Sequence, residues 1–127
     1  MAGHTIKNLM DVEDSASSSS DVEARFARRH LDSRELGVSY FRYAPGYRSK
    51  MGHSHREQEE AYVVVSGSGR AKLDEEIVEL RQWDVLRVAP EVVRAFEGGP
   101  EGLELIIVGS ARPEEGDGVP VKDWWSD

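Results

Sequence analysis

Cysteine is absent from this 127-residue sequence, and so are long apolar runs. Without cysteine the chain has no disulfides, no thiolate nucleophile and no cysteine-based zinc site. No apolar run approaches the roughly 18 residues of a membrane-spanning helix, and the N-terminal residues lack the apolar core of a signal peptide. We therefore expect a cytoplasmic protein that does not enter a membrane.

Positive charge is scarce, because 16 lysines and arginines face 24 aspartates and glutamates, for a net charge of −8. Such a chain repels the phosphates of nucleic acids and anionic lipid surfaces. Neither nucleic acid nor membrane is therefore expected as a partner. With 39% hydrophobic and 31% charged residues, the composition predicts one domain with a modest core and a heavily charged surface.

Helical periodicity is also missing, since no stretch of ten or more residues shows an apolar repeat of 3.6. The chain instead carries short apolar and aromatic runs, such as residues 61–66, 85–88 and 103–110, separated by glycine, proline and acidic turns. Short strands at intervals of roughly 8–12 residues are typical of β-sandwiches and barrels. The sequence therefore predicts an all-β fold.

Three segments follow from the pattern. Residues 1–21 are expected to hold a short strand and a serine-rich loop, residues 22–110 the barrel, and residues 111–127 an extended tail. The tail ends near Trp124 and Trp125, whose indoles should pack on the chain's own outer sheet or anchor a partner subunit.

A small basic cluster near residues 25–30 is expected to point outward. Arg25, Arg28, Arg29 and His30 lie on or next to an expected strand. Charged side chains on an edge strand commonly prevent edge-to-edge association. We therefore expect no binding role for this cluster.

Two histidines and a glutamate form the most informative group of polar residues. His53 and His55 are two residues apart, which on a strand places both rings on one face. Glu60 lies five residues further, where the next strand begins. Imidazole and carboxylate ligands suit zinc, iron, manganese, copper or nickel. The spacing alone leaves open the alternative of exposed histidines on a charged loop that bind nothing.

Residues 46–67 resemble the first sequence motif of the cupin family. That motif has a glycine, a His-x-His pair, a glutamate after three or four residues, and a second glycine after six more. His53, His55 and Glu60 stand at the ligand positions, although six residues rather than five follow the first glycine. Glu59 is a rival for the carboxylate position, but only Glu60 leaves the six-residue gap to the second glycine.

The resemblance covers about residues 36–110, and it implies a small single-domain cupin. The implied fold is a single double-stranded β-helix, a jelly-roll-like barrel. The implied cofactor is a divalent transition metal such as Fe, Zn, Mn or Ni at His53, His55 and Glu60. Small cupins commonly pair, so the resemblance also implies a homodimer.

The second cupin motif is where the sequence departs from the family. The family residues there are glycine, proline, glycine, histidine and asparagine. The corresponding residues here are Trp83, Ala89, Glu91, Arg94 and Gly98. Arg94 thus stands in place of the fourth metal ligand, and a guanidinium cannot lose its proton to bind a metal.

Three arrangements around Arg94 remain open. A metal is held by His53, His55 and Glu60 alone, with open coordination positions. Alternatively, Arg94 pairs with Glu60 inside the barrel and replaces the metal. In the third arrangement, Arg94 binds the carboxylate or phosphate of a ligand through paired hydrogen bonds.

Further residues are expected at the ligand site. Met51 and Phe96 share strand parity with His53 and Arg94, so they are expected to form apolar pocket walls. The other candidates for contact with a ligand are Tyr47 and Glu59, which in an enzyme would move protons.

The function predicted from these features is the binding of a small, anionic molecule in the barrel, with Arg94 as its anchor. The alternative is a metal-dependent enzyme, of the dioxygenase or isomerase type, that acts on a small acid or sugar. A scaffold with a vestigial pocket is a third, weaker hypothesis. Fold alone does not decide among them, because cupins host many chemistries on one barrel.

Overall fold

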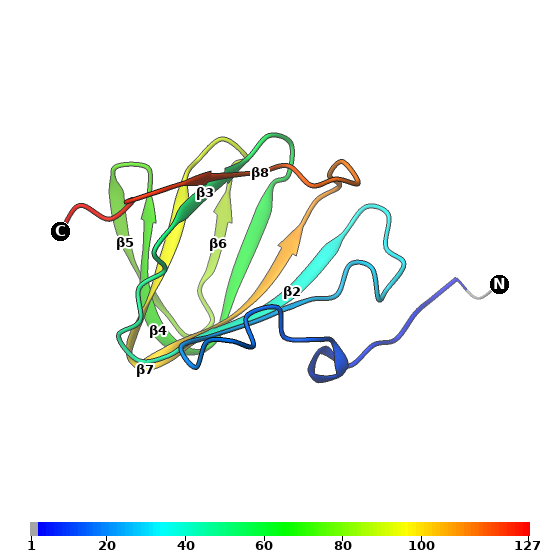
Figure 1. Ribbon diagram of the computed structural model, residues 1–127, viewed down its shortest axis with the longest axis horizontal. Helices are drawn as coiled ribbons and strands as arrows, with labels where there is room; N and C mark the ends of the chain where they lie inside the picture. Colours follow the sequence, from blue (N-terminus) through cyan, green and yellow to red (C-terminus); the bar gives the residue numbers. More distant parts are fainter. Residues whose placement is uncertain (1–2) are drawn as a thin grey trace.

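The structure is a computed structural model that describes residues 3–127, and it confirms the predicted all-β fold (Figure 1). One short 3-10 turn, η1, spans Leu9–Asp11. No helix in the described range has the length and apolar character to cross a membrane. The eight strands are β1 (Val22–Phe26), β2 (Gly37–Tyr43), β3 (Gly52–His55), β4 (Glu60–Leu73), β5 (Glu76–Arg81), β6 (Val85–Val88), β7 (Arg94–Gly109) and β8 (Gly118–Val121).

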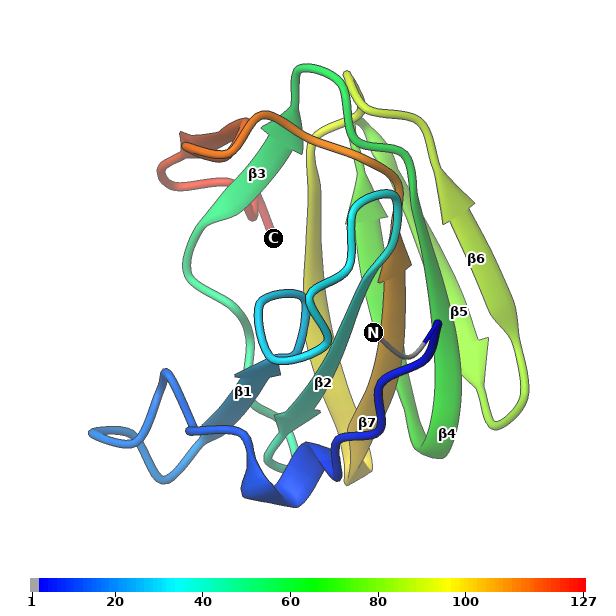
Figure 2. The ribbon, with the colours of Figure 1, turned by 90° about the vertical axis from the view of Figure 1, so that its right-hand side faces the viewer.

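Two long strands, β4 and β7, form the spine of the barrel. They run antiparallel along almost their whole lengths, from Glu60 opposite Gly109 to Leu73 opposite Arg94. The first part of β4 also pairs with β6, and its later part pairs with β5. The later part of β7 pairs with β2, which in turn pairs with β1. All eight strands thus belong to one sheet, which curls around a common interior (Figures 1 and 2).

The sheet bends where the β4–β7 register shifts, between Val64 and Ser66 and again between Gly67 and Gly69. Gly67 has a φ of +77°, and a Cβ atom added there would lie 2.1 Å from the carbonyl oxygen of Gly102. Register irregularities of this kind bend and twist a strand pair. Because of these bends, β4 and β7 each contribute to both sides of the barrel.

Alternating burial along β4 and β7 places the core and the polar site on the same inner face. Glu60, Tyr62 and Val64 are buried, while the residues between them are only partly buried. A strand with this period of two turns every second side chain inward. The buried apolar core comprises Tyr43, Tyr62, Val64, Ala71, Leu80, Val88, Phe96, Leu103, Leu105 and Ile107.

The strand expected within residues 1–14 is absent from the described part, residues 3–14, where the only regular element is η1. Hydrogen bonds from backbone amides to side chains take the place of strand pairing in this segment. Asn8 accepts a hydrogen bond from the amide of Met10 at 2.8 Å, and Asp14 accepts from the amides of Ala16 and Ala24 at 2.9 Å. Such local bonds compete with sheet pairing, so the segment lies against β1 without joining it.

The C-terminal boundary expected at residue 110 falls too early, because β8 pairs with β3 and belongs to the barrel. Four residue pairs join the two strands, from Gly52 opposite Val121 to His55 opposite Gly118. By contrast, β3 pairs with β7 only at His53 and Arg94. The last strand of the chain is therefore the main neighbour of β3.

Both indoles of the tail pack on this chain rather than projecting into solvent. A Cβ atom added at Gly52 would lie 2.8 Å from the Trp124 ring, and Lys72 Nζ donates to the Trp124 carbonyl at 2.6 Å. The Trp125 indole donates to the Ser49 carbonyl at 2.8 Å. The tail therefore packs against the outer side of the start of β3.

Replacing Gly67 tests the bend. We expect Gly67→Ala to lower the free energy of unfolding by about 2 kcal/mol or more, because it combines a positive φ with a backbone clash. Urea denaturation measures the loss. Gly118→Ala is the control, since an added Cβ there meets nothing within 4 Å and should change stability by less than about 0.5 kcal/mol. Equal losses in both variants would contradict the role given to Gly67.

Candidate functional site

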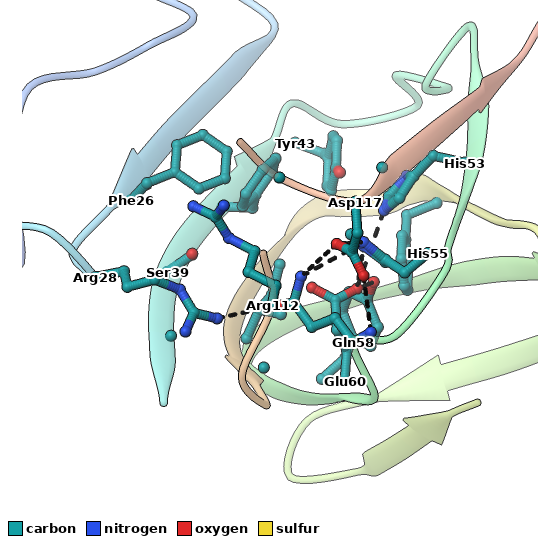
Figure 3. Close-up of a pocket in the computed structure, with 18 residues that line it drawn as sticks. Phe26, Arg28, Ser39, Tyr43, His53, His55, Gln58, Glu60, Arg112 and Asp117 are labelled. Atoms are coloured by element: carbon teal, nitrogen blue, oxygen red, sulfur yellow. Dashed lines mark hydrogen bonds and ion pairs between the residues drawn. The ribbon is translucent and has the colours of Figure 1, made fainter. Parts of the chain in front are cut away.

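A cavity of about 310 Å³ opens into the barrel (Figure 3). One part of its wall is polar and includes His53, His55, Glu60 and Asp117. Aromatic and aliphatic side chains form much of the rest. Pockets that bind small molecules begin at about this size and combine apolar walls with a few polar groups.

The two histidines of β3 and the first residue of β4 converge on this wall. His55 Nε2 lies 3.3 Å from Glu60 Oε1, and His53 Nε2 lies 4.0 Å from the same oxygen. One ligand atom from each of the three residues lies within 4.8 Å of the others. The alternative of histidines on an exposed loop is wrong, because His53 and His55 lie on a paired strand and line the cavity.

Glu60 is a buried carboxylate with several polar neighbours. The Tyr62 hydroxyl donates a hydrogen bond to its Oε1 atom, and Arg94 Nε lies 3.9 Å from that oxygen. Burial alone would raise the pKa of Glu60, but His55, Tyr62 and Arg94 together lower it below its ordinary value. The group is therefore ionised at neutral pH.

Arg94 is completely buried and does not line the cavity, which corrects its expected role as a ligand anchor. Its terminal nitrogens donate to the carbonyls of Ala89 and Pro90 at 3.2 and 3.4 Å. The turn before β7 thus holds the guanidinium behind Glu60. Of the three arrangements open from the sequence, the observed one places Arg94 beside Glu60 and leaves the cavity side of the carboxylate free.

Asp117 fixes the orientation of the His55 ring. Its Oδ1 lies 2.8 Å from His55 Nδ1, and its Oδ2 accepts from the amides of Glu57 and Gln58 at 2.9 and 2.8 Å. Although burial raises the pKa of Asp117, these hydrogen bonds outweigh it and hold the pKa well below its ordinary value. The ionised carboxylate is an acceptor, so Nδ1 of His55 carries a proton.

The other nitrogen of His55 is then free to bind a metal. Nε2 is buried and has no hydrogen-bond partner among the residues described. Burial lowers the pKa of His55, but Glu60 and Asp117 outweigh burial and raise it, so metal binding must displace a proton from this ring. In the neutral ring, the Nε2 lone pair faces the Glu60 oxygen, so the two repel each other. A cation between them turns this repulsion into attraction, and the donor set thus fits a metal ion.

His53 completes the group as a neutral imidazole. Its pKa is lowered to about 4, chiefly by burial, although the Glu60 charge acts in the opposite direction. Its ring stands perpendicular to that of His55, with centroids 5.0 Å apart. A neutral imidazole keeps a lone pair available for a metal at neutral pH.

Of the two expected apolar walls, only Phe96 lines the cavity. Its ring lies 4.7 Å from that of Tyr62. Met51 does not line the cavity and is 43% exposed. The parity argument fails for Met51 because β3 begins only at Gly52, so strand alternation does not extend to it.

Tyr47 and Glu59 also lie outside the cavity. Tyr47 stacks on Tyr43 in the core, with ring centroids 6.2 Å apart. Glu59 is exposed and pairs with Arg87 of β6, just before β4 turns its next residue inward. Neither side chain is therefore placed to contact a molecule in the cavity, and Glu60 rather than Glu59 supplies the carboxylate.

Sequence reasoning missed three charged residues that line the cavity, namely Arg28, Arg112 and Asp117. The outward orientation expected for the basic cluster is wrong for Arg28, because β1 ends at Phe26 and the following turn directs this side chain inward. No local motif marks these residues. Asp117 is 62 positions from His55 and reaches it only because β8 pairs with β3.

No protein-family model and no curated protein sequence matches the chain. Solved structures of similar fold include a cupin protein from Bacteroides fragilis, with a TM-score of 0.71 and 21% identity over 100% of this chain and 99% of that one. KdgF from Halomonas sp. gives a TM-score of 0.69 and 15% identity over 91% and 98% of the two chains.

Oxalate decarboxylase from Bacillus subtilis gives a TM-score of 0.75 and 20% identity over 91% of this chain. This chain spans about a third of the decarboxylase, because the match covers 32% of that protein. These similarities agree with the all-β barrel described above. The chain therefore has the fold of these proteins, a single double-stranded β-helix barrel.

Proposed function

We propose that this cupin domain binds a divalent transition metal through His53, His55 and Glu60, and that its cavity holds a small molecule beside the metal. One observation carries the proposal. The three ligand atoms lie within 4.8 Å of one another on the wall of a cavity of about 310 Å³, and Nε2 of His55 is buried there without a hydrogen-bond partner.

The protonation states of the three residues support metal binding. Asp117 holds the proton on Nδ1 of His55, burial keeps His53 neutral, and Glu60 is ionised. A neutral imidazole, a second imidazole whose Nε2 proton the metal displaces, and one carboxylate suit Fe, Zn, Mn or Ni, and metal availability decides among them. A metal bound there with open positions would act as a Lewis acid toward a molecule in the cavity.

Arg94 is the main argument against a metal. Two unit charges about 4 Å apart interact by roughly 4 kcal/mol at an effective dielectric constant of 20. However, the guanidinium is held behind Glu60 by the carbonyls of Ala89 and Pro90, and it does not enter the cavity. We propose that Arg94 offsets the charge of Glu60 without displacing the metal, and that it weakens metal binding relative to a fourth histidine.

Two functional classes fit this site. The first is a binding protein that takes up a small anionic molecule without transforming it. The second is a metal-dependent enzyme, of the dioxygenase or isomerase type, that acts on a small acid or sugar. The second is favoured by the cavity, which His53, His55 and Glu60 all line, so that a bound molecule reaches the proposed metal directly. The similar fold of oxalate decarboxylase, which is named as an enzyme, also supports the second class.

Elemental analysis tests the metal site directly. Untagged protein purified without chelator should contain close to one transition-metal ion per chain. The His53→Ala/His55→Ala variant should lose it. The chain has four histidines, so His4→Ala/His30→Ala is a matched control that should keep the metal. Absence of metal from the unsubstituted protein after reconstitution with iron, zinc, manganese and nickel would overturn the proposal.

Asp117 provides a second test. Asp117→Asn should weaken metal affinity by about 10–100-fold, because the amide no longer provides an anionic acceptor for the Nδ1 proton of His55. Competition with a chromophoric chelator measures the affinity. Asp123→Asn is the control, since Asp123 is exposed and makes no ion pair with the residues described. Unchanged affinity in Asp117→Asn would show that the His55 ring does not depend on this carboxylate.

We also propose that the protein is a cytoplasmic homodimer. The turn between β5 and β6 and the start of β6 carry the most exposed large apolar side chains of the barrel itself, with Trp83 68% and Val85 66% exposed. Tryptophan is enriched among the residues that dominate protein interfaces. These side chains are therefore the proposed contact.

Light scattering after size exclusion tests this assembly. Trp83→Gln should weaken dimerisation by about 2 kcal/mol or more and yield monomers at micromolar concentration. Leu36→Gln, which changes an apolar side chain that is 55% exposed elsewhere, should leave the dimer intact. A monomeric unsubstituted protein would refute the dimer.

A further inference from the structure

We propose that Arg28 and Arg112 form an anion-binding subsite in the cavity, and that the ligand is a small organic acid whose carboxylate or phosphate binds there. The inference rests on the proposed function, because it names the chemical class of the molecule held beside the metal site. Figure 3 shows both guanidiniums on one side of the cavity, away from His53 and Glu60. A molecule that fills the cavity therefore extends from the arginines toward the proposed metal.

Arg28 is directed into the cavity by specific contacts. Its Nη2 atom donates to Gln58 Oε1 at 3.1 Å and to the Ser110 carbonyl at 2.8 Å. The guanidinium lies against Gly37, where an added Cβ atom would be only 2.4 Å from Nη2. Two hydrogen-bond acceptors hold the Arg28 side chain, and the absence of a Cβ at Gly37 leaves the space that it occupies. The side chain is therefore fixed in place, unlike the mobile arginines of an open surface.

The two arginines have no carboxylate in direct contact among the described residues. Neither forms an ion pair with any carboxylate in residues 3–127, although the chain as a whole is acidic. Burial and then the nearby charge of Arg112 lower the pKa of Arg28, and they outweigh the opposite effect of the Asp117 and Glu60 carboxylates. An anion that accepts hydrogen bonds from both guanidiniums relieves this repulsion, and their forked donors match the oxygens of a carboxylate or phosphate.

The remaining walls indicate the body of the ligand. Phe26, Phe41, Phe96 and Ile107 line the cavity along with the arginines. Such walls favour a compact apolar or aromatic body over a fully hydroxylated sugar, because burying hydroxyl groups without partners costs free energy. The favoured ligand is therefore a small acid with an apolar body rather than a neutral sugar.

Gln58 connects the anion subsite to the metal site. While its Oε1 accepts from Arg28, its Nε2 donates to Asp117 Oδ1 at 3.3 Å. Asp117 in turn binds His55. The same buried amide thus sets the positions of a cavity arginine and of the carboxylate that orients a metal ligand.

Calorimetry with charged and neutral probes tests the inference. The probes are benzoate and phenyl phosphate, with benzamide as the uncharged counterpart of benzoate. Each is titrated into chelator-treated protein and into protein reconstituted with zinc. Binding of the acids to the chelator-treated protein does not involve a metal, so failure of the proposed metal site and failure of the anion subsite give different results.

We expect at least one acid to bind at millimolar or lower concentration, and benzamide to bind at least tenfold more weakly. Arg28→Gln/Arg112→Gln should lower acid affinity by tenfold or more. Arg29→Gln/Arg56→Gln removes the same charge from exposed positions and should leave affinity within twofold. Thermal melting checks that each variant folds.

A second variant keeps the subsite testable if the double substitution unfolds the protein. Gly37→Ala retains both charges but displaces the Arg28 guanidinium, so it should weaken binding of the acid more than that of benzamide. Equal binding of benzoate and benzamide, undiminished acid binding in the folded Arg28→Gln/Arg112→Gln variant, or no binding of either acid would overturn the inference. Preference between the two acids identifies the anionic group as carboxylate or phosphate.

Discussion

The carboxylate of Glu60, buried inside an apolar barrel, is the constraint on which the rest of the site depends. A lone buried charge costs several kcal/mol, so its surroundings must compensate it. Tyr62 donates to it from the same strand, Arg94 stands behind it at 3.9 Å, and the two histidines face it from β3. The polar part of the interior is thus organised around one inward-facing residue at the start of β4.

Strand periodicity explains why much of the fold and the central part of the site were predictable from sequence. Residues two apart share a face of a strand. The side chains of His53 and His55 must therefore point the same way, and so must those of Glu60 and Tyr62. Turn residues divided the chain into short strands and thereby indicated a barrel. The parity rule failed where a strand had not yet begun, as at Met51, or had already ended, as at Arg28, and the strand expected near the N-terminus is replaced by local caps in residues 3–14.

The rest of the site depends on contacts between distant segments, which leave no local pattern. Asp117 reaches His55 across 62 positions, and Arg28 reaches the Ser110 carbonyl across 82. The direction of Arg94 was likewise set by two carbonyl groups of a turn rather than by residue type. The residue types predicted which side chains could form a metal or anion site together. Only the closed barrel determined which of these side chains come into contact.

The pairing of β3 with β8 has a consequence for biosynthesis. The strand with His53 and His55 is synthesised well before its main neighbour, β8. Asp117 and the indole that packs on Gly52 emerge equally late. The histidines therefore reach their final geometry only once β8 has emerged, and a nascent chain without β8 lacks the arrangement proposed to hold a metal.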